Sequence, residues 1–210
     1  MVAAAPLFFP AARVAIAVQD DQRVMLHGLT WGQYLAISDA LPDHAGVRMT
    51  YLEGTLEIMT TGSRHEVLKK TLARLLEAYA DETRIRITGY GNTTFRKQAM
   101  ERGLGPDECY TRRRLVEGDM PDLAIEIVVS HGDIDKLAVS AGLGVGEVWS
   151  WENGAIAVSC LGANGYEPSP RSRLFPDLDV AELARFVSSD DQSTEQVESA
   201  VKSSALVPRP

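Results

Sequence analysis

The stretch PDLAIEIVVSHGDIDK, from Pro121 to Lys136, indicates the fold because it joins a buried strand to the start of a helix. The apolar run from Leu123 to Val129 is typical of a strand covered on both faces. Only Glu126 interrupts this run. An ionised carboxylate in such a place is costly unless a cation, a proton or a partner offsets the cost. We therefore expect Glu126 to serve a function, and metal binding is the first hypothesis.

A second carboxylate, Asp107, begins the strand that precedes the Glu126 strand, and the turn LVEGDM joins the two strands. Two carboxylates on adjoining strands, completed by a backbone carbonyl and waters, provide the hard oxygen donors that Mg²⁺ accepts. Two simpler interpretations stay open: Glu126 could pair with a buried arginine, and Asp107 could be a turn residue. Asp122 is predicted to share the face of Glu126, and we interpret it as the start of the strand or an arginine partner.

Lys136 follows ten residues after Glu126, in the first turn of a predicted helix from Ile134 to about Ala141. Helical side chains tilt toward the N-terminus of their helix, so the ammonium group can lean back over the end of the strand. Beside a metal, Lys136 would orient a water molecule or stabilise negative charge during phosphodiester hydrolysis. Taken alone, it would be an ordinary surface lysine.

The remaining pattern predicts an α/β fold with a central mixed β-sheet flanked by helices, to which an N-terminal helix and a hairpin are added. We expect helices at 31–40, from Ser63 onward and at 180–187, the second of them opened by an S-x-x-E capping box. The expected strands cover 49–59 as a hairpin around Gly54, then 83–88, 92–98, 107–112, 147–151 and 155–161.

Composition predicts one soluble domain, since 210 residues with 45% apolar and 24% charged residues are enough for a full core. We assign residues 1–28 to an N-terminal arm, 29–187 to the domain and 188–210 to a disordered polar tail. The apolar N-terminus lacks an early positive charge and is split by prolines, so we expect no membrane association. Cys109 and Cys160 form no closely spaced pair, which favours a reducing, cytoplasmic setting.

Charge is distributed unevenly along the chain. The net charge is −8, yet residues 64–114 hold 12 Lys and Arg against 7 Asp and Glu. The densest basic cluster is Arg112, Arg113 and Arg114, which could bind phosphates beside the site or simply keep a strand end soluble. A homodimer is also expected, because cutting two strands with one site per chain favours a two-fold assembly.

These motifs resemble those of the PD-(D/E)XK restriction-endonuclease-like superfamily and, within it, the Uma2 type of restriction endonuclease. The resemblance runs from about Leu29 to Val158 through LTWGQYLAI, YLEGTLEIM, SRHEVLKKTLARLL, GPDECY, PDLAIEIVVS and GLGVGEVWSW. It implies that Asp107 and Glu126 are the metal-binding acids and that Lys136 is the motif lysine. Val128 stands at the usual lysine position, so the lysine would have moved to the following helix.

The resemblance also implies supporting roles for Glu53 in the early hairpin and His65 at the start of the long helix. Glu53 could equally be a turn residue, and His65 could serve in hydrogen bonding at the helix start. The implied activity is a Mg²⁺-dependent nuclease, with Mn²⁺ as a substitute, that hydrolyses phosphodiester bonds in DNA. Two alternatives stay open: a catalytically weak nuclease-like module that binds nucleic acid or acts as an accessory, and another metal-dependent hydrolase.

Overall fold

Two β-sheets form the framework of the computed structural model, which describes residues 20–41, 47–189, 199 and 206. The first sheet is antiparallel throughout, with the strand order β1-β3-β2-β6-β5. Its strands are β1 (Gln22–Leu26), β2 (Val47–Leu52), β3 (Thr55–Thr60), β5 (Phe95–Lys97) and β6 (Arg102–Leu104). The predicted hairpin around Gly54 is therefore confirmed as β2 and β3, and it belongs to this sheet rather than to the mixed one.

The second sheet is the predicted mixed sheet, with the strand order β11-β10-β9-β8-β7-β4. Its strands are β4 (Thr88–Gly89), β7 (Glu108–Thr111), β8 (Leu123–Val128), β9 (Glu147–Glu152), β10 (Ala155–Gly162) and β11 (Gly165–Ser169). Only β8 and β9 are parallel, while the other neighbours are antiparallel. Parallel neighbours need a crossover connection, and the helix that begins at Lys136 provides it.

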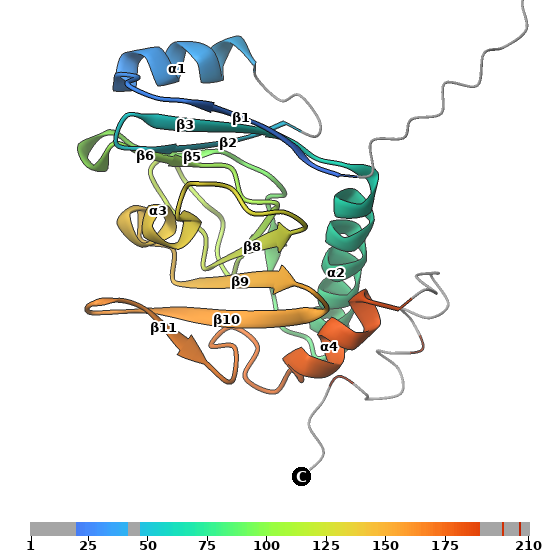
Figure 1. Ribbon diagram of the computed structural model, residues 1–210. Coiled ribbons are helices and arrows are strands. Elements are labelled where there is room, and N and C mark those ends of the chain that lie inside the picture. The colour runs from blue at the N-terminus through green and yellow to red at the C-terminus, as the bar shows by residue number, and fades with distance from the viewer. Residues whose placement is uncertain (1–19, 42–46, 190–198, 200–205, 207–210) are drawn as a thin grey trace, which may run out of the picture.

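In the described part of the chain, four α-helices pack around and between the sheets: α1 (Trp31–Ala40), α2 (Ser63–Glu82), α3 (Lys136–Leu143) and α4 (Val180–Val187). A short 3₁₀ helix, η1, covers Gln98–Met100. Figure 1 shows α1 on the outer side of the first sheet, α3 between the two sheets, and α2 running along the side of both. Helix α4 contacts α2 and β10.

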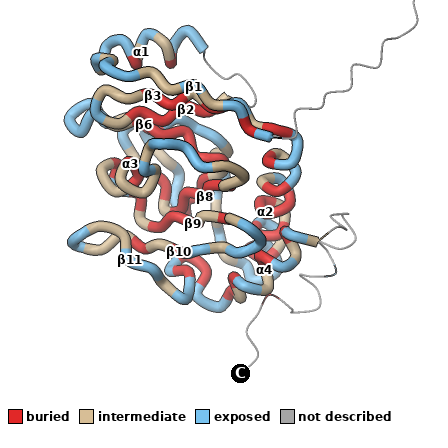
Figure 2. Tube along the Cα trace, viewed as in Figure 1, coloured by how far each residue is buried: buried red, intermediate tan, exposed pale blue. Residues whose placement is uncertain are grey.

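The two faces of β8 meet different surroundings, as the alternation of its side chains predicts. Leu123, Ile125 and Ile127 join the core formed with α2 and α4, whereas Ala124 packs with Val139 of α3. Figure 2 shows β8, β9 and the inner side of α2 as a continuous buried region. Glu126 has the same orientation as Ala124, so its side chain faces α3 and the first sheet.

The first sheet also has side chains that point toward the space between the two sheets. Met49 and Tyr51 of β2, with Leu56 of β3, pack with Tyr34 of α1 in a core of their own on the outer face. The alternating positions of β2 and β3 must therefore point inward. Two of these positions carry charges, Arg48 and Glu57, and both are buried.

The starts of α2 and α3 differ from their predicted form. Helix α2 begins at Ser63 as expected, but its N-cap is Gly62 with no side-chain cap, so the predicted capping box is wrong. The Glu66 carboxylate instead accepts a hydrogen bond from Thr61 and pairs with Lys69, each at 2.6 Å. Helix α3 begins two residues later than expected, where the Asp135 side chain accepts the N–H of Ala138. Lys136 is therefore the first residue of the helix.

The predicted terminal segments fall only partly within the described residues. Residues 1–19 of the predicted arm lie outside them, and residues 22–26 form β1, which pairs with β3 as an edge strand. Most of the predicted tail also lies outside them. Leu206, however, is buried in the core with α4, and its carbonyl accepts the N–H of Asp179 at 2.7 Å. The chain therefore returns to the core at this point.

This contact predicts a measurable contribution of Leu206 to stability. Replacing Leu206 by alanine should lower the free energy of unfolding by about 2–4 kcal/mol, because it removes buried methyl groups and leaves a cavity. Urea denaturation would measure the change. Val116→Ala is the control, since Val116 is 69% exposed and should change stability by less than about 0.5 kcal/mol. Equal stability of Leu206→Ala and the unaltered protein would contradict the packing of this residue.

Trp149 and Trp151 of β9 are buried in the core with Phe175. Cys109 and Cys160 are both buried and unpaired. Within the described ranges, no helix is long and apolar enough to cross a membrane.

Candidate functional site

The two predicted acids meet where β7 begins beside β8. The N–H of Asp107 donates to the carbonyl of Ile125 at 3.1 Å, and Asp107 Oδ2 accepts the N–H of Ile127 at 2.8 Å. These two bonds flank Glu126 on both sides along the strand. The negative charge of Asp107 acts on Glu126 closely enough to raise its pKa. The predicted juxtaposition of the two carboxylates is therefore what the structure shows.

Both carboxylates are buried, and each keeps one oxygen without a hydrogen bond. Asp107 is 1% exposed and Glu126 is 3% exposed. Glu126 Oε1 accepts no hydrogen bond, and Asp107 Oδ1 has only the ion-pair contacts of His65 at 2.9 Å and Arg48 at 3.4 Å. Buried polar atoms normally have partners, so the exception at Glu126 points to a ligand or to catalysis.

Lys136 reaches back from the first turn of α3 to this pair, as predicted from the tilt of helical side chains. Its Nζ lies 2.6 Å from Glu126 Oε2 and donates a hydrogen bond to it. Burial tends to lower the pKa of Lys136, but the charges of Glu126 and Asp107 outweigh this effect and raise it. Lys136 is therefore positively charged and held against Glu126.

Glu126 itself is poised between its two protonation states. Burial raises the pKa of its carboxyl group to about 7, although the nearby charge of Lys136 works in the opposite direction. A carboxyl group with a pKa near neutrality beside a lysine is the kind of perturbation that clusters at functional sites. Asp107 behaves differently, because His65 and Lys136 lower its pKa in spite of its burial.

His65 lies between Asp107 of the acid pair and Asp21, which precedes β1. Its Nε2 lies 2.9 Å from Asp107 Oδ1, at ion-pair distance but outside hydrogen-bond geometry, and its Nδ1 lies 3.1 Å from Asp21 Oδ2. Burial lowers the pKa of His65, but the two aspartates outweigh it and raise the pKa to about 9. His65 is therefore a buried cation between two carboxylates, and its supporting role stays a prediction.

The inner face of the first sheet adds charged residues that the sequence did not indicate as members of the site. Arg48 Nε lies 3.4 Å from Asp107 Oδ1. Arg23 Nε lies 3.6 Å from Glu57 Oε2, and its Nη2 donates to the carbonyl of Ser130 at 2.8 Å. Ser130 belongs to the connection between Glu126 and Lys136, so Arg23 fixes this connection against the first sheet.

Glu57 is the residue that sequence reasoning should have found. It is 2% exposed, its Oε2 accepts no hydrogen bond, and it lies so close to Gly132 that a Cβ there would overlap its carboxylate. Its charge also contributes to the raised pKa of Lys136. The signal was the one used for Glu126, a single carboxylate within the apolar pattern of a strand.

Taken together, the site holds equal numbers of acids and bases. Within the described chain, four carboxylates and four basic groups form this cluster, and His65 is charged at neutral pH. The Glu66–Lys69 pair adjoins the cluster through Arg48 and adds one charge of each sign. The acids are Asp21, Glu57, Asp107 and Glu126, and the bases are Arg23, Arg48, His65 and Lys136. Formal charges in this cluster therefore cancel when every group is ionised.

Glu53 lies outside this cluster, contrary to the supporting role expected for it. It occupies the turn between β2 and β3 with a φ of 44°. Its side chain is 65% exposed and pairs with Arg102 at 3.3 Å. The simpler interpretation of Glu53 as a turn residue is the one that fits the structure, and the buried acid of this hairpin is Glu57.

The arginine cluster also lies away from the acids, because β7 runs antiparallel to β8. Arg112 follows the end of β7, and its N–H donates to Asp122 Oδ2 at the start of β8, at 2.7 Å. Glu126 is near the other end of β8. Arg113 pairs with Asp119 and Arg114 is exposed. These arginines therefore do not flank the candidate site, and Asp122 anchors the strand start.

The carboxylates of the site fit Mg²⁺ better than a structural zinc ion. Among the residues described, no group of three or more His, Cys, Asp or Glu side chains is arranged to hold a metal. A closed structural zinc site therefore does not fit. Mg²⁺ commonly takes one or two carboxylates and keeps waters or substrate oxygens in its other positions. The carboxylates of Asp107 and Glu126 fit this second mode.

The mixed sheet, the flanking helices and the added hairpin sheet define a restriction-endonuclease-like α/β protein. The model of the Uma2 family, described as "Putative restriction endonuclease", matches residues 31–190. The chain therefore belongs to the Uma2 family. No curated protein matches the sequence.

Proposed function

We propose that the protein is a Mg²⁺-dependent nuclease that hydrolyses phosphodiester bonds in DNA. One observation carries the proposal: Asp107 and Glu126 lie on adjoining strands, Glu126 keeps a buried oxygen that accepts no hydrogen bond, and Lys136 is 2.6 Å from Glu126. Family membership supports the same class of activity. The metal, the substrate and the residue roles are inferences from this geometry.

In this proposal the carboxylates of Asp107 and Glu126 hold the ion. When bound, Mg²⁺ would polarise the phosphoryl oxygens and lower the pKa of a water molecule. Lys136 would orient the attacking water or stabilise the negative charge that develops on the phosphoryl group. His65 and Arg48 would keep Asp107 ionised and fixed in place, since both lie at its Oδ1.

The balance of charges suggests how the ion and the substrate depend on each other. The cluster is formally neutral when all its groups are ionised, so a divalent cation alone would leave two positive charges uncompensated in a buried place. A phosphodiester brings a negative charge with it. We therefore expect the ion to bind more tightly in the presence of the substrate than in its absence, a coupling that must be reciprocal.

A plasmid-nicking assay tests the proposal. With Mg²⁺ or Mn²⁺ the unaltered protein should nick supercoiled DNA, and Glu126→Gln should lower the rate by about 10³-fold or more. Glu53→Gln is the matched control, because this exposed glutamate lies outside the cluster. Equal nicking by the unaltered protein and Glu126→Gln would show that another site or a contaminant is responsible.

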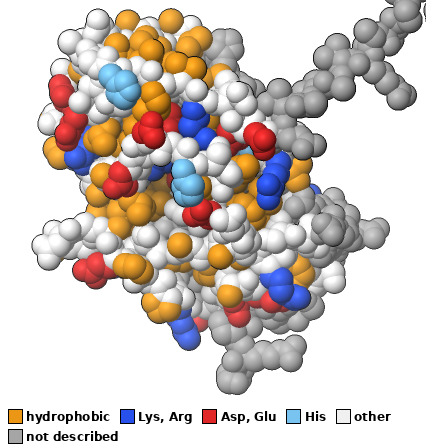
Figure 3. Space-filling model, in the orientation of Figure 1, with side chains coloured by type: hydrophobic (Ala, Val, Ile, Leu, Met, Phe, Trp, Pro, Cys, Tyr) orange, Lys and Arg blue, Asp and Glu red, His pale blue; other side chains and the backbone are white. Residues whose placement is uncertain are grey.

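The rival proposal is a nuclease-like module that binds nucleic acid without cutting it. The net charge of −8 does not separate the two proposals, because an acidic protein repels a polyanion whether or not it cuts it. On the face shown in Figure 3, acidic and basic side chains are interspersed rather than separated by sign. Binding of DNA without cleavage in Mg²⁺ and Mn²⁺, unchanged by Glu126→Gln, would favour this rival. The homodimer stays a prediction, which sedimentation would test.

A further inference from the structure

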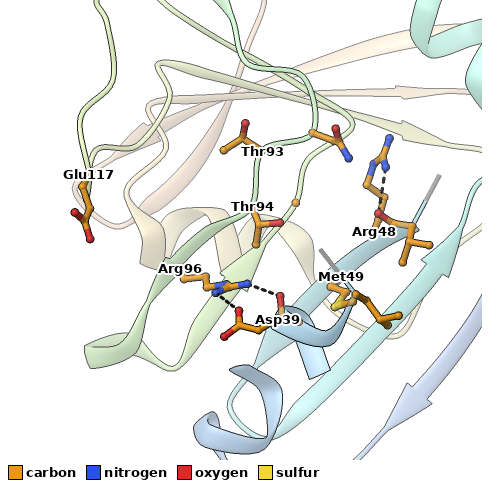
Figure 4. A pocket seen from close by; sticks show the side chains of 12 residues that line it. Asp39, Arg48, Met49, Thr93, Thr94, Arg96 and Glu117 are labelled. Atoms are coloured by element: carbon orange, nitrogen blue, oxygen red, sulfur yellow. Dashed lines mark hydrogen bonds and ion pairs between the residues drawn. The ribbon is translucent and has the colours of Figure 1, made fainter. Parts of the chain in front are cut away.

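A pocket of about 670 Å³ opens where β2 begins, beside the candidate site. Its volume lies within the range typical of small-molecule and cofactor sites. Figure 4 shows Arg48 and Glu117 on opposite sides of it, with Thr93 and Thr94 between them. No part of the proposed catalytic cluster other than Arg48 lines this pocket.

Arg48 connects the pocket to the acid pair. This arginine is only 4% exposed, and its Nε forms no hydrogen bond although it lies 3.4 Å from Asp107 Oδ1. The pocket wall at Gly105 is also two residues from Asp107, and the N–H of Gly105 donates to the carbonyl of Met49 at 3.1 Å. The Arg48 side chain therefore lies between the pocket and Asp107, one of the proposed metal ligands.

The lining indicates which part of a substrate would enter. Leu41 and Met49 offer apolar surface, while Asn92, Thr93 and Thr94 offer amide and hydroxyl groups. Such a combination suits a flat ring with polar edges, since apolar contact holds the ring and polar groups select its edge. Arg48 lies at the side nearest Asp107, where its guanidinium, which also pairs with Glu66 at 3.8 Å, would attract a phosphate.

The other charged groups disfavour a second phosphate inside the pocket. Arg96 is already held by Asp39 at 3.0 Å and by Ser38 at 2.5 Å, and its guanidinium lies over the ring of Tyr34. Glu117 adds a carboxylate on the side opposite Arg48. The arrangement therefore favours one base within the pocket and one phosphate at its inner end.

We propose that this pocket is a nucleotide subsite, which takes an unstacked base of the substrate strand while the adjoining phosphate lies at Arg48. The inference deepens the proposed function, and it rests on that function only for the position of the cut. A base must leave the helical stack to enter, so single-stranded or locally opened DNA should be preferred.

Gly105 offers a way to fill the pocket. A Cβ at this position would meet only ordinary contacts, the nearest being Thr94 Oγ1 at 3.5 Å, the carbonyl of Asn92 at 3.7 Å and that of Met49 at 3.9 Å. All three neighbours line the pocket, so a leucine side chain at 105 would extend into it. Gly32→Leu is the matched control, because a Cβ there meets nothing within 4 Å and Gly32 does not line the pocket.

The first measurement is the binding of a short labelled single-stranded DNA in EDTA, followed by fluorescence anisotropy at low salt. Gly105→Leu should weaken binding about tenfold, in keeping with the loss of one base contact, while Gly32→Leu should not change it. The same DNA with abasic sugars should bind the unaltered protein about tenfold more weakly. Gly105→Leu should bind the two DNAs equally.

Unchanged affinity of a folded Gly105→Leu protein would overturn the subsite. If circular dichroism shows that this variant does not fold, Thr94→Leu decides in its place, since Thr94 is exposed and lines the same pocket. Cleavage is measured separately with Mg²⁺. If the unaltered protein cuts DNA and the variants bind DNA normally, the nuclease proposal holds and the subsite proposal is wrong. If binding depends on the base but no cleavage occurs, the subsite proposal holds and the nuclease proposal is wrong.

Discussion

Replacing Lys136 by methionine is expected to lower the rate of DNA cleavage about 10³-fold, because it removes the only basic group that donates a hydrogen bond to Glu126 among the described residues. The same change should not weaken metal binding. Lys136 Nζ occupies Glu126 Oε2 at 2.6 Å and carries a positive charge, so it competes electrostatically with a cation. We expect Mn²⁺ to bind the variant at least as tightly as it binds the unaltered protein.

Isothermal titration with Mn²⁺ and a nicking assay on the same preparations would separate the two effects. Lys70→Met is the matched control, because Lys70 is an exposed lysine on α2 that makes no contact with the acid pair. A loss of Mn²⁺ binding in Lys136→Met would mean that the lysine acts structurally, by holding Glu126 in place. Full cleavage activity would remove Lys136 from the mechanism altogether.

The parts of the fold that could be predicted are those that local sequence determines. Helix α1 is capped by Thr30, whose side chain accepts the N–H of Gln33, and its predicted bounds are those observed. The turn at Asn153 and Gly154 has positive φ at both residues, as a tight hairpin requires. Asp107, Glu126 and Lys136 also came from short-range information, since one hairpin and one helix turn bring them together.

The parts that could not be predicted depend on how the two sheets pack. Arg23 and Arg48 reach the site from the first sheet, and no spacing in the sequence relates them to Glu126. The arginine cluster was placed wrongly for a related reason. It is near Asp107 along the chain, but β7 carries Arg112 toward the opposite end of β8. β11 was not predicted, because Gly165 and Pro168 are unusual within a strand.

Replacing His65 by leucine is expected to lower the free energy of unfolding by about 3–5 kcal/mol, the range for breaking a buried ion pair. His65 is fully buried and lies between Asp21 and Asp107 at 3.1 and 2.9 Å. Without it, two buried carboxylates lose the cation that they share. Urea denaturation in EDTA would measure the change, and His131→Leu is the control, since His131 is 76% exposed and should matter little.

A second measurement connects this loss of stability to metal binding. A cation bound at Asp107 Oδ1 would supply positive charge where His65 Nε2 had been, so Mn²⁺ should restore part of the stability of His65→Leu. A ligand that binds only the folded state stabilises it according to its affinity. The midpoint of urea denaturation should therefore rise with Mn²⁺ more in His65→Leu than in His65→Leu combined with Asp107→Asn. An equal rise in both proteins would mean that Asp107 does not bind the ion.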